Sequence, residues 1–114
     1  MTVLLIGFAG AAGVLARYGV GQLTPSIWAT FWVNVVGSLL LGVLIHIGRD
    51  LDPVVRDALS VGFLGGFTTF STFAMQAVLE ADDARLGSAV LYVIGSVLCG
   101  IAAAAIGYYG AKAL

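Results

Sequence analysis

The residues best suited to chemistry form one block from Gly62 to Phe73, which mixes paired glycines, hydroxyl side chains and phenylalanines. The block lies within an uncharged stretch from Ala58 to Leu79, long enough for a bilayer-crossing helix, which takes about 20 apolar residues. A helix that only has to span gains nothing from these residues, because each interior glycine costs about 1 kcal/mol relative to alanine. The block therefore predicts a helix broken at its centre, with backbone or hydroxyl groups at work inside the membrane.

Two kinds of ligand chemistry are available in this block. Backbone carbonyls freed between Gly65 and Thr68 could coordinate a small hard cation such as Na⁺, as unwound helices do in transport proteins. Phe70 and Phe73 project from one helix face, where their positive ring edges could meet an anion, although a packing stripe is the alternative. No carboxylate lies in this span to repel an anion or to carry a proton.

Polar side chains in the other spans could complete such a path. Asn34 offers either an NH₂ donor for an anion or a hydrogen bond between helices. Tyr92 and Ser96 lie one turn apart and could line a narrow wet track or bond to a neighbouring helix. Arg17 either extends to the interface or draws anions toward an aqueous mouth. Residue type and spacing do not decide between the two possible roles at any of these three places.

Composition fixes the class of protein that must position these groups. The 114-residue chain is 61% hydrophobic and 10% charged, whereas soluble domains carry about 25% charged residues. We expect an all-α integral membrane protein of one domain, surrounded by lipid and not bound to nucleic acid, without a cleaved signal peptide because the amino end lacks a basic region. Its four transmembrane helices would cover residues 2–22, 27–47, 58–79 and 86–111.

The basic residues give almost no guide to orientation in the membrane. One side would hold three of them and the other side two, whereas orientation normally follows an excess of basic residues near span ends. Either one orientation prevails by a small margin, or the chain inserts both ways and pairs antiparallel. No internal repeat is visible, so a twofold axis in the membrane plane would need two chains. We expect an antiparallel, dual-topology dimer.

Three segments of the chain resemble signatures of the Fluc (CrcB-type) fluoride channel family, small four-span membrane proteins of bacteria. The segment from Gly10 to Tyr18 is similar to the family's first-helix signature, and Val33-Asn34 with Gly37-Ser38 is similar to its second. The Gly62–Phe73 block matches the third-helix signature almost without departure. The resemblance covers essentially the whole length.

This resemblance implies a passive, fluoride-selective ion channel in the cell (inner) membrane, a dual-topology homodimer with two pores that exports fluoride and lowers its toxicity in the cytoplasm. Arg17 would lie near a pore vestibule, and backbone carbonyls of Gly65 and Thr68 would hold one structural Na⁺ at the dimer centre. The fluoride path would be lined by polar and aromatic side chains: Asn34, Phe70, Ser71, Thr72, Phe73, Tyr92 and Ser96.

Two positions depart from the family pattern. Gln76 stands where many relatives have a glutamate, so this position keeps its hydrogen-bonding capacity but carries no titratable charge. Gly100 stands where many relatives have a further hydroxyl side chain. These departures leave open a heterodimer with a paralogous subunit.

Two other functions compete with a channel. A small proton-coupled cation or drug antiporter of the four-helix dimer type needs a membrane-embedded carboxylate, and every Asp and Glu here lies in a loop or at a span end. A non-transporting membrane assembly subunit would explain the small-residue helices but not a polar, glycine-rich block inside a span. With one histidine, one cysteine and no catalytic triad, we expect no enzyme activity.

Overall fold

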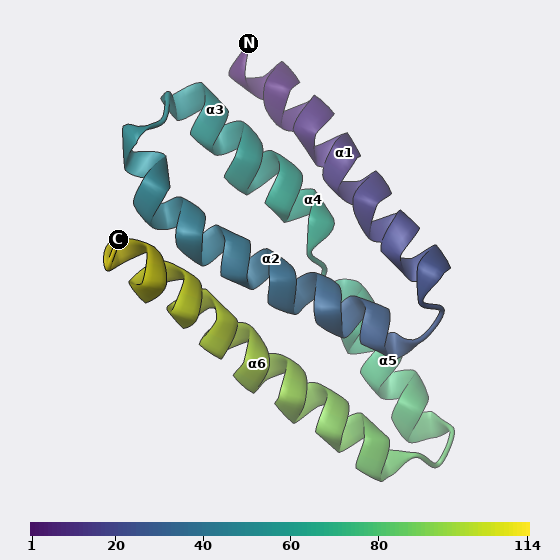
Figure 1. The fold of residues 1–114 in the computed structure, drawn as a ribbon. Helices are drawn as coiled ribbons and strands as arrows, with labels where there is room; N and C mark the ends of the chain where they lie inside the picture. Colours follow the sequence, from purple (N-terminus) through teal and green to yellow (C-terminus); the bar gives the residue numbers. More distant parts are fainter.

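The chain is a multi-pass membrane protein. The computed structural model describes residues 1–114 and contains four helical segments long and apolar enough to cross a membrane. They lie side by side and alternate in direction along the chain, in a slab of 49 × 32 × 20 Å (Figure 1). The segments are Thr2–Leu23, Ile27–Asp50, Pro53–Asp82 and Leu86–Lys112.

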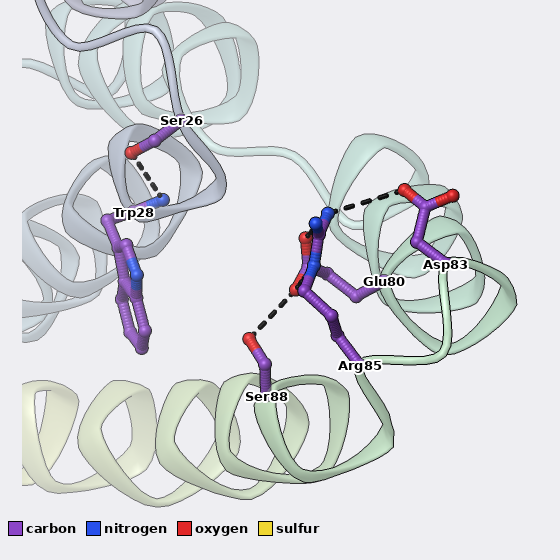
Figure 2. A network of polar contacts seen from close by, with 6 residues as sticks. All are labelled: Ser26, Trp28, Glu80, Asp83, Arg85 and Ser88. Carbon is purple, nitrogen blue, oxygen red and sulfur yellow. Dashed lines mark hydrogen bonds and ion pairs between the residues drawn. The ribbon is translucent and has the colours of Figure 1, made fainter.

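The first two segments are joined by a short turn with a side-chain cap. Helix α1 (Thr2–Leu23) ends before this turn, and α2 (Ile27–Ile47) begins after Ser26. The Ser26 hydroxyl oxygen accepts a hydrogen bond of 3.2 Å from the Trp28 backbone N–H (Figure 2). Serine is a favoured residue at this position because it satisfies an amide that the first helical turn leaves free.

The third segment is built from several short helical pieces. After the 3₁₀ turn η1 (Gly48–Asp50), α3 (Pro53–Asp57) begins where the Asp52 carboxylate accepts from the Val54 N–H at 2.8 Å. This cap, with proline in the first turn, starts the segment earlier than the uncharged stretch at residue 58, because charged residues are tolerated at a membrane helix end. The chain then forms a π-helix, η2 (Ala58–Leu64), and a single turn, α4 (Gly65–Phe67).

Regular helix stops after α4 and resumes at α5 (Ser71–Asp82). Thr68 has an extended backbone, with φ −85° and ψ 159°. In Figure 1 this stretch is the thin connection between α4 and α5, which lies beside the middle of α2. The interrupted backbone lies within the apolar segment Pro53–Asp82, where each exposed peptide group needs a partner.

A polar network closes the turn between α5 and α6 (Leu86–Lys112), at one end of the molecule (Figure 2). The Arg85 guanidinium donates to both carboxylate oxygens of Glu80, at 3.2 and 2.9 Å, and to Asp83 at 3.3 Å. The Ser88 hydroxyl donates to Glu80 at 2.8 Å. Hydrogen bonding to the Glu80 carboxylate raises the pKa of Arg85. These groups lie at the end of α5, in the turn and at the start of α6, away from the interruption.

Glycines allow the helices to pack with their backbones in contact. A Cβ at Gly42 of α2 would overlap the Ala104 carbonyl of α6, and a Cβ at Gly107 of α6 would overlap the Leu39 carbonyl of α2. On the other side of the molecule, a Cβ at Gly13 of α1 would overlap the Phe63 carbonyl of η2. Small residues at helix contacts are the usual means of association in lipid.

Candidate functional site

Asn34 of α2 binds the interrupted backbone of the third segment through both ends of its amide. Its Nδ2 donates to the Thr69 carbonyl at 2.9 Å, and its Oδ1 accepts from the Thr69 N–H at 2.8 Å. An amide side chain matches a peptide group in this way because each offers one donor beside one acceptor. Asn34 therefore holds the backbone open at Thr69, and one hydrogen of its NH₂ group stays free of these bonds.

This arrangement frees two carbonyl oxygens. In a continuous helix the Gly65 carbonyl would accept from the Thr69 N–H, which here donates to Asn34. The Thr68 carbonyl would accept from the Thr72 N–H, which here donates to the Thr69 hydroxyl at 3.3 Å. Gly65 and Thr68 therefore present carbonyls whose helical partners have been taken by side chains.

Arg17 of α1 satisfies a further carbonyl at the end of α4. Its Nε donates to the Gly66 carbonyl at 3.1 Å. A cation at a helix C-terminus is favourable because the last carbonyls carry partial negative charge. The two terminal NH₂ groups of the guanidinium make no hydrogen bond within the chain. Arg17 thus anchors the interruption and keeps donors for another partner.

One cavity of about 300 Å³ brings several of the predicted residues together on one side of the interruption. It contains Asn34, both residues with freed carbonyls and the ring of Phe70, which is 78% exposed in the single chain. No acidic or basic side chain lines it. The full lining is Asn34, Gly37, Ser38, Leu41, Ser60, Leu64, Gly65, Thr68, Thr69 and Phe70.

A second cavity of about 510 Å³ lies on the other side of the interruption. Arg17, expected near a vestibule, and Thr72, expected along the fluoride path, both line it, and Thr69 lies on the walls of both cavities. Gln76, one turn beyond Thr72 on α5, lines it as well. Arg17 is the only charged side chain on its walls, so the cavity favours anions over cations.

Four aromatic side chains form a continuous series of ring contacts. The Phe70 and Phe73 centroids are 5.8 Å apart at an interplanar angle of 53°, and Phe73 lies 5.2 Å from Tyr92. Trp28 meets Tyr92 edge to face at 5.9 Å. Phe73 is 9% exposed and Tyr92 is completely enclosed. The predicted phenylalanine pair and Tyr92 therefore lie together, with only Phe70 open to the outside of the chain.

Two other predicted residues lie apart from this group. Ser71 is exposed, at the first turn of α5, and Ser96 lines neither cavity. The Ser96 hydroxyl is buried with no hydrogen-bond partner. Gly100, one turn further along α6, lies opposite Ser38 of α2, whose hydroxyl would be 3.9 Å from a Cβ at that position. A hydroxyl is therefore present at this level, but α2 supplies it.

Several contributors were not predicted from the sequence. Thr69 supplies the backbone bonded by Asn34, and Gly66 supplies the carbonyl bonded by Arg17. The only available signal was that both residues fall inside the glycine- and threonine-rich block. The π-helix Ala58–Leu64 had no signal in the sequence at all.

Comparison with known proteins places these residues in a family context. A family model described as CrcB-like protein, Camphor Resistance (CrcB), matches residues 4–108. The chain is 46% identical over 106 residues to the fluoride-specific ion channel FluC 1 of Rhodococcus jostii, covering 92% of this chain and 81% of that protein. It is 43% identical to FluC 2 of the same organism, covering 95% of this chain and 96% of that protein. It is 37% identical to the fluoride-specific ion channel FluC of Thermus thermophilus, covering 92% of this chain and 90% of that protein.

Proposed function

This chain belongs to the CrcB-like protein family, and we propose that it is a fluoride-specific ion channel that lets fluoride leave the cell passively across the inner membrane. The relatives named above as fluoride channels align with more than nine-tenths of the chain. The observation that carries the proposal is the interrupted third segment, where hydrogen-bond donors and aromatic rings gather without a carboxylate. No enzymatic step is part of it.

The fluoride path requires donors that replace water around a small, strongly hydrated anion. The unused hydrogen of Asn34 and the hydroxyl of Thr72, which line the two cavities, supply such donors. The proposal adds the hydroxyls of Ser71, which is exposed in the single chain, and of Ser96, which is buried without a partner outside both cavities. The positive edges of the Phe70 and Phe73 rings add weak attraction without a fixed charge. A path of this kind binds the ion strongly enough for entry and weakly enough for release.

The broken helix also fits a structural Na⁺. Gly65 and Thr68 offer carbonyl oxygens whose amide partners are bonded to Asn34 and to the Thr69 hydroxyl. Neutral oxygen ligands of this kind suit a hard monovalent cation, and a hard cation would satisfy the partial charges left at the end of α4. Two such carbonyls from each of two chains would complete the coordination.

The complete channel is an antiparallel homodimer. Within one chain, Phe70 and the cavity containing the freed carbonyls open outward, next to apolar surface that a second copy would cover. The nearly balanced basic residues allow insertion in both orientations. A paralogous partner is the alternative assembly, since Rhodococcus jostii has two relatives, named FluC 1 and FluC 2.

The proposal is tested by fluoride efflux from liposomes that contain the purified chain. A channel releases fluoride down its gradient, does not release chloride, and needs no proton gradient. A proton-coupled antiporter would need the proton gradient, and an assembly subunit would release nothing. The absence of fluoride efflux from a correctly folded dimer would contradict the proposal.

A further inference from the structure

A wholly apolar groove runs between α2 and the π-helix η2, at the end of the molecule where the α2–α3 turn lies (Figure 1). Its volume is about 300 Å³, and every residue that lines it is hydrophobic. Val43 and Ile47 of α2 form part of one wall, and Leu59 and Phe63 of η2 form part of the other. Ile47 and Leu59 are both exposed. The groove is therefore open to the surroundings of the chain and is not part of an enclosed core.

This groove uses a different face of α2 from the first cavity. Ser38 and Leu41 line the first cavity, whereas Val43 and Ile47 line the groove, and the two sets are about a third of a turn apart around the helix. Leu64 of η2 is buried and lies on the walls of both. A second copy that covers the first cavity therefore leaves the groove on the other side of Leu64 to the membrane.

An acyl chain is the natural occupant of such a groove, but its hydrocarbon alone would not hold it there. Lipid tails are as apolar as leucine, so a chain that moves from bulk lipid into the groove gains packing contacts and little transfer free energy. Only a contact with the headgroup can keep one lipid at the site longer than its neighbours. The polar groups at the open end of the groove therefore decide which lipid binds.

Arg56 of α3 lies at that end, three residues before Leu59. Its aliphatic stem packs on α2, because a Cβ at Gly48 would be 3.2 Å from Arg56 Cγ and 3.6 Å from Cδ1 of Leu44, which lines the groove. Arg56 Nε is 3.5 Å from the Asp57 carboxylate. The terminal NH₂ groups of the guanidinium make no hydrogen bond within the chain, and 44% of the side chain is exposed. This free planar fork matches the geometry of a phosphate group.

The depth of Arg56 in the membrane also suits a lipid phosphate. The chain carries five charged residues between Arg49 and Asp57, and charged residues at span ends lie at the level of the lipid headgroups. Basic side chains beside membrane helices bind lipid phosphates at this level. A lipid whose chain fills the groove would therefore bring its phosphate to Arg56.

We propose that the groove between α2 and η2 binds one acyl chain of a membrane phospholipid, whose phosphate is held by the Arg56 guanidinium. The bound chain packs against Leu64 from behind, and so supports the π-helix and the wall of the first cavity. This site goes beyond the proposed function and does not depend on it, because neither the groove nor Arg56 belongs to the fluoride path.

Native mass spectrometry of the purified chain in detergent tests the proposal with two lipids that share their acyl chains. Dioleoylphosphatidylglycerol carries a phosphate, whereas monogalactosyl dioleoylglycerol carries a neutral sugar. We expect one phosphatidylglycerol to be retained per chain, about tenfold more strongly than the galactolipid, because hydrogen bonds between charged groups are the stronger ones. Phosphatidylglycerol should also raise the midpoint of thermal unfolding more than the galactolipid does.

Three variants separate the headgroup contact from the groove. Arg56→Gln should lower phosphatidylglycerol retention by about tenfold and abolish its advantage in thermal unfolding. Arg49→Gln is the matched control: it removes the same charge from the same end of the chain, but Arg49 does not line the groove, so retention should be unchanged. Val43→Phe places a ring in the groove and should lower retention of both lipids. Arg56 is on the surface, so its variant remains informative if Val43→Phe fails to fold.

Three results would overturn the inference. Equal retention of the two lipids by the native chain would remove the phosphate contact. Native retention by Arg56→Gln would remove Arg56 from the site. Loss of the dimer in Val43→Phe, with lipid retention unchanged, would show that a second copy of the chain covers the groove. None of these measurements involves fluoride efflux, so a failure of the proposed function would be seen separately.

Discussion

Replacing Asn34 with alanine should both destabilise the protein and remove the interruption of its third segment. The change leaves the Thr69 N–H and carbonyl without their partners at 2.8 and 2.9 Å. Each lost bond is worth about 1 kcal/mol on average, and bonds between membrane helices average about 0.6 kcal/mol. We therefore expect a total loss of about 1–2 kcal/mol in the free energy of unfolding.

The structural consequence is more specific than the energetic one. Once Asn34 is gone, the Thr69 N–H can donate to the Gly65 carbonyl, as in a continuous helix. Hydrogen exchange measured by mass spectrometry should therefore change in peptides that contain Thr69, and fluoride efflux should be lost. Asn34→Asp is the graded variant, because it keeps the acceptor for Thr69 N–H but removes the donor. Val36→Ala, on the exposed face of α2, is the control.

The reasoning about Asn34 would be refuted by one combination of results. An Asn34→Ala protein with native unfolding free energy and native hydrogen exchange at Thr69 would show that the amide does not hold the backbone open. Loss of efflux alone, with both of those values unchanged, would leave Asn34 as an anion ligand without the positioning role.

Three further predictions follow from the packing and from the freed carbonyls. Gly13→Ala should destabilise the protein by about 1–3 kcal/mol in thermal or denaturant unfolding, because its Cβ would overlap the Phe63 carbonyl. Gly95→Ala, with open space around the new Cβ, should leave the stability unchanged. If Gly13→Ala and Gly95→Ala changed the free energy of unfolding equally, close packing of α1 at Gly13 would be contradicted. Arg17→Ala should lower both stability and efflux, since it removes the bond to the Gly66 carbonyl as well as the positive charge of the second cavity; an effect on efflux alone would deny the anchoring role. Exchanging Na⁺ for N-methylglucamine should shift the dimer toward monomer in detergent, and a dimer equally stable without Na⁺ would contradict the proposed cation site.

Much of the fold followed from composition, because span length and the absence of charge are strong constraints in lipid. The four spans are recognisable from uncharged or nearly uncharged stretches, the first of which is interrupted by Arg17. The first residue of the third span was harder to predict from the sequence. The Asp52 cap and Pro53 start the helix before residue 58, so the helix includes charged residues that the uncharged stretch leaves out. Helix ends depend on local capping, which hydropathy does not register.

The site could be predicted as a list of residues but not as a set of contacts. Side-chain types suggested that Asn34 and Tyr92 face polar partners, yet a sequence does not say which atoms meet. Their partners, Thr69 and Gln76, lie 35 and 16 positions away along the chain. The Tyr92–Gln76 bond also changes the chemistry expected of Tyr92, because its only proton is used within the protein. The hydrogen-bonding role of Tyr92 can therefore be assigned only when its partner in the folded chain is known.

The most direct measurement of the central claim is the reversal potential of current through a planar bilayer that contains only this chain. With fluoride unequal on the two sides, the current should reverse at the fluoride equilibrium potential, which changes by about 59 mV for each tenfold gradient of a monovalent ion. Chloride and proton gradients should not move it. A reversal potential that follows chloride or protons, or the absence of current from a folded dimer, would contradict fluoride conduction by this protein.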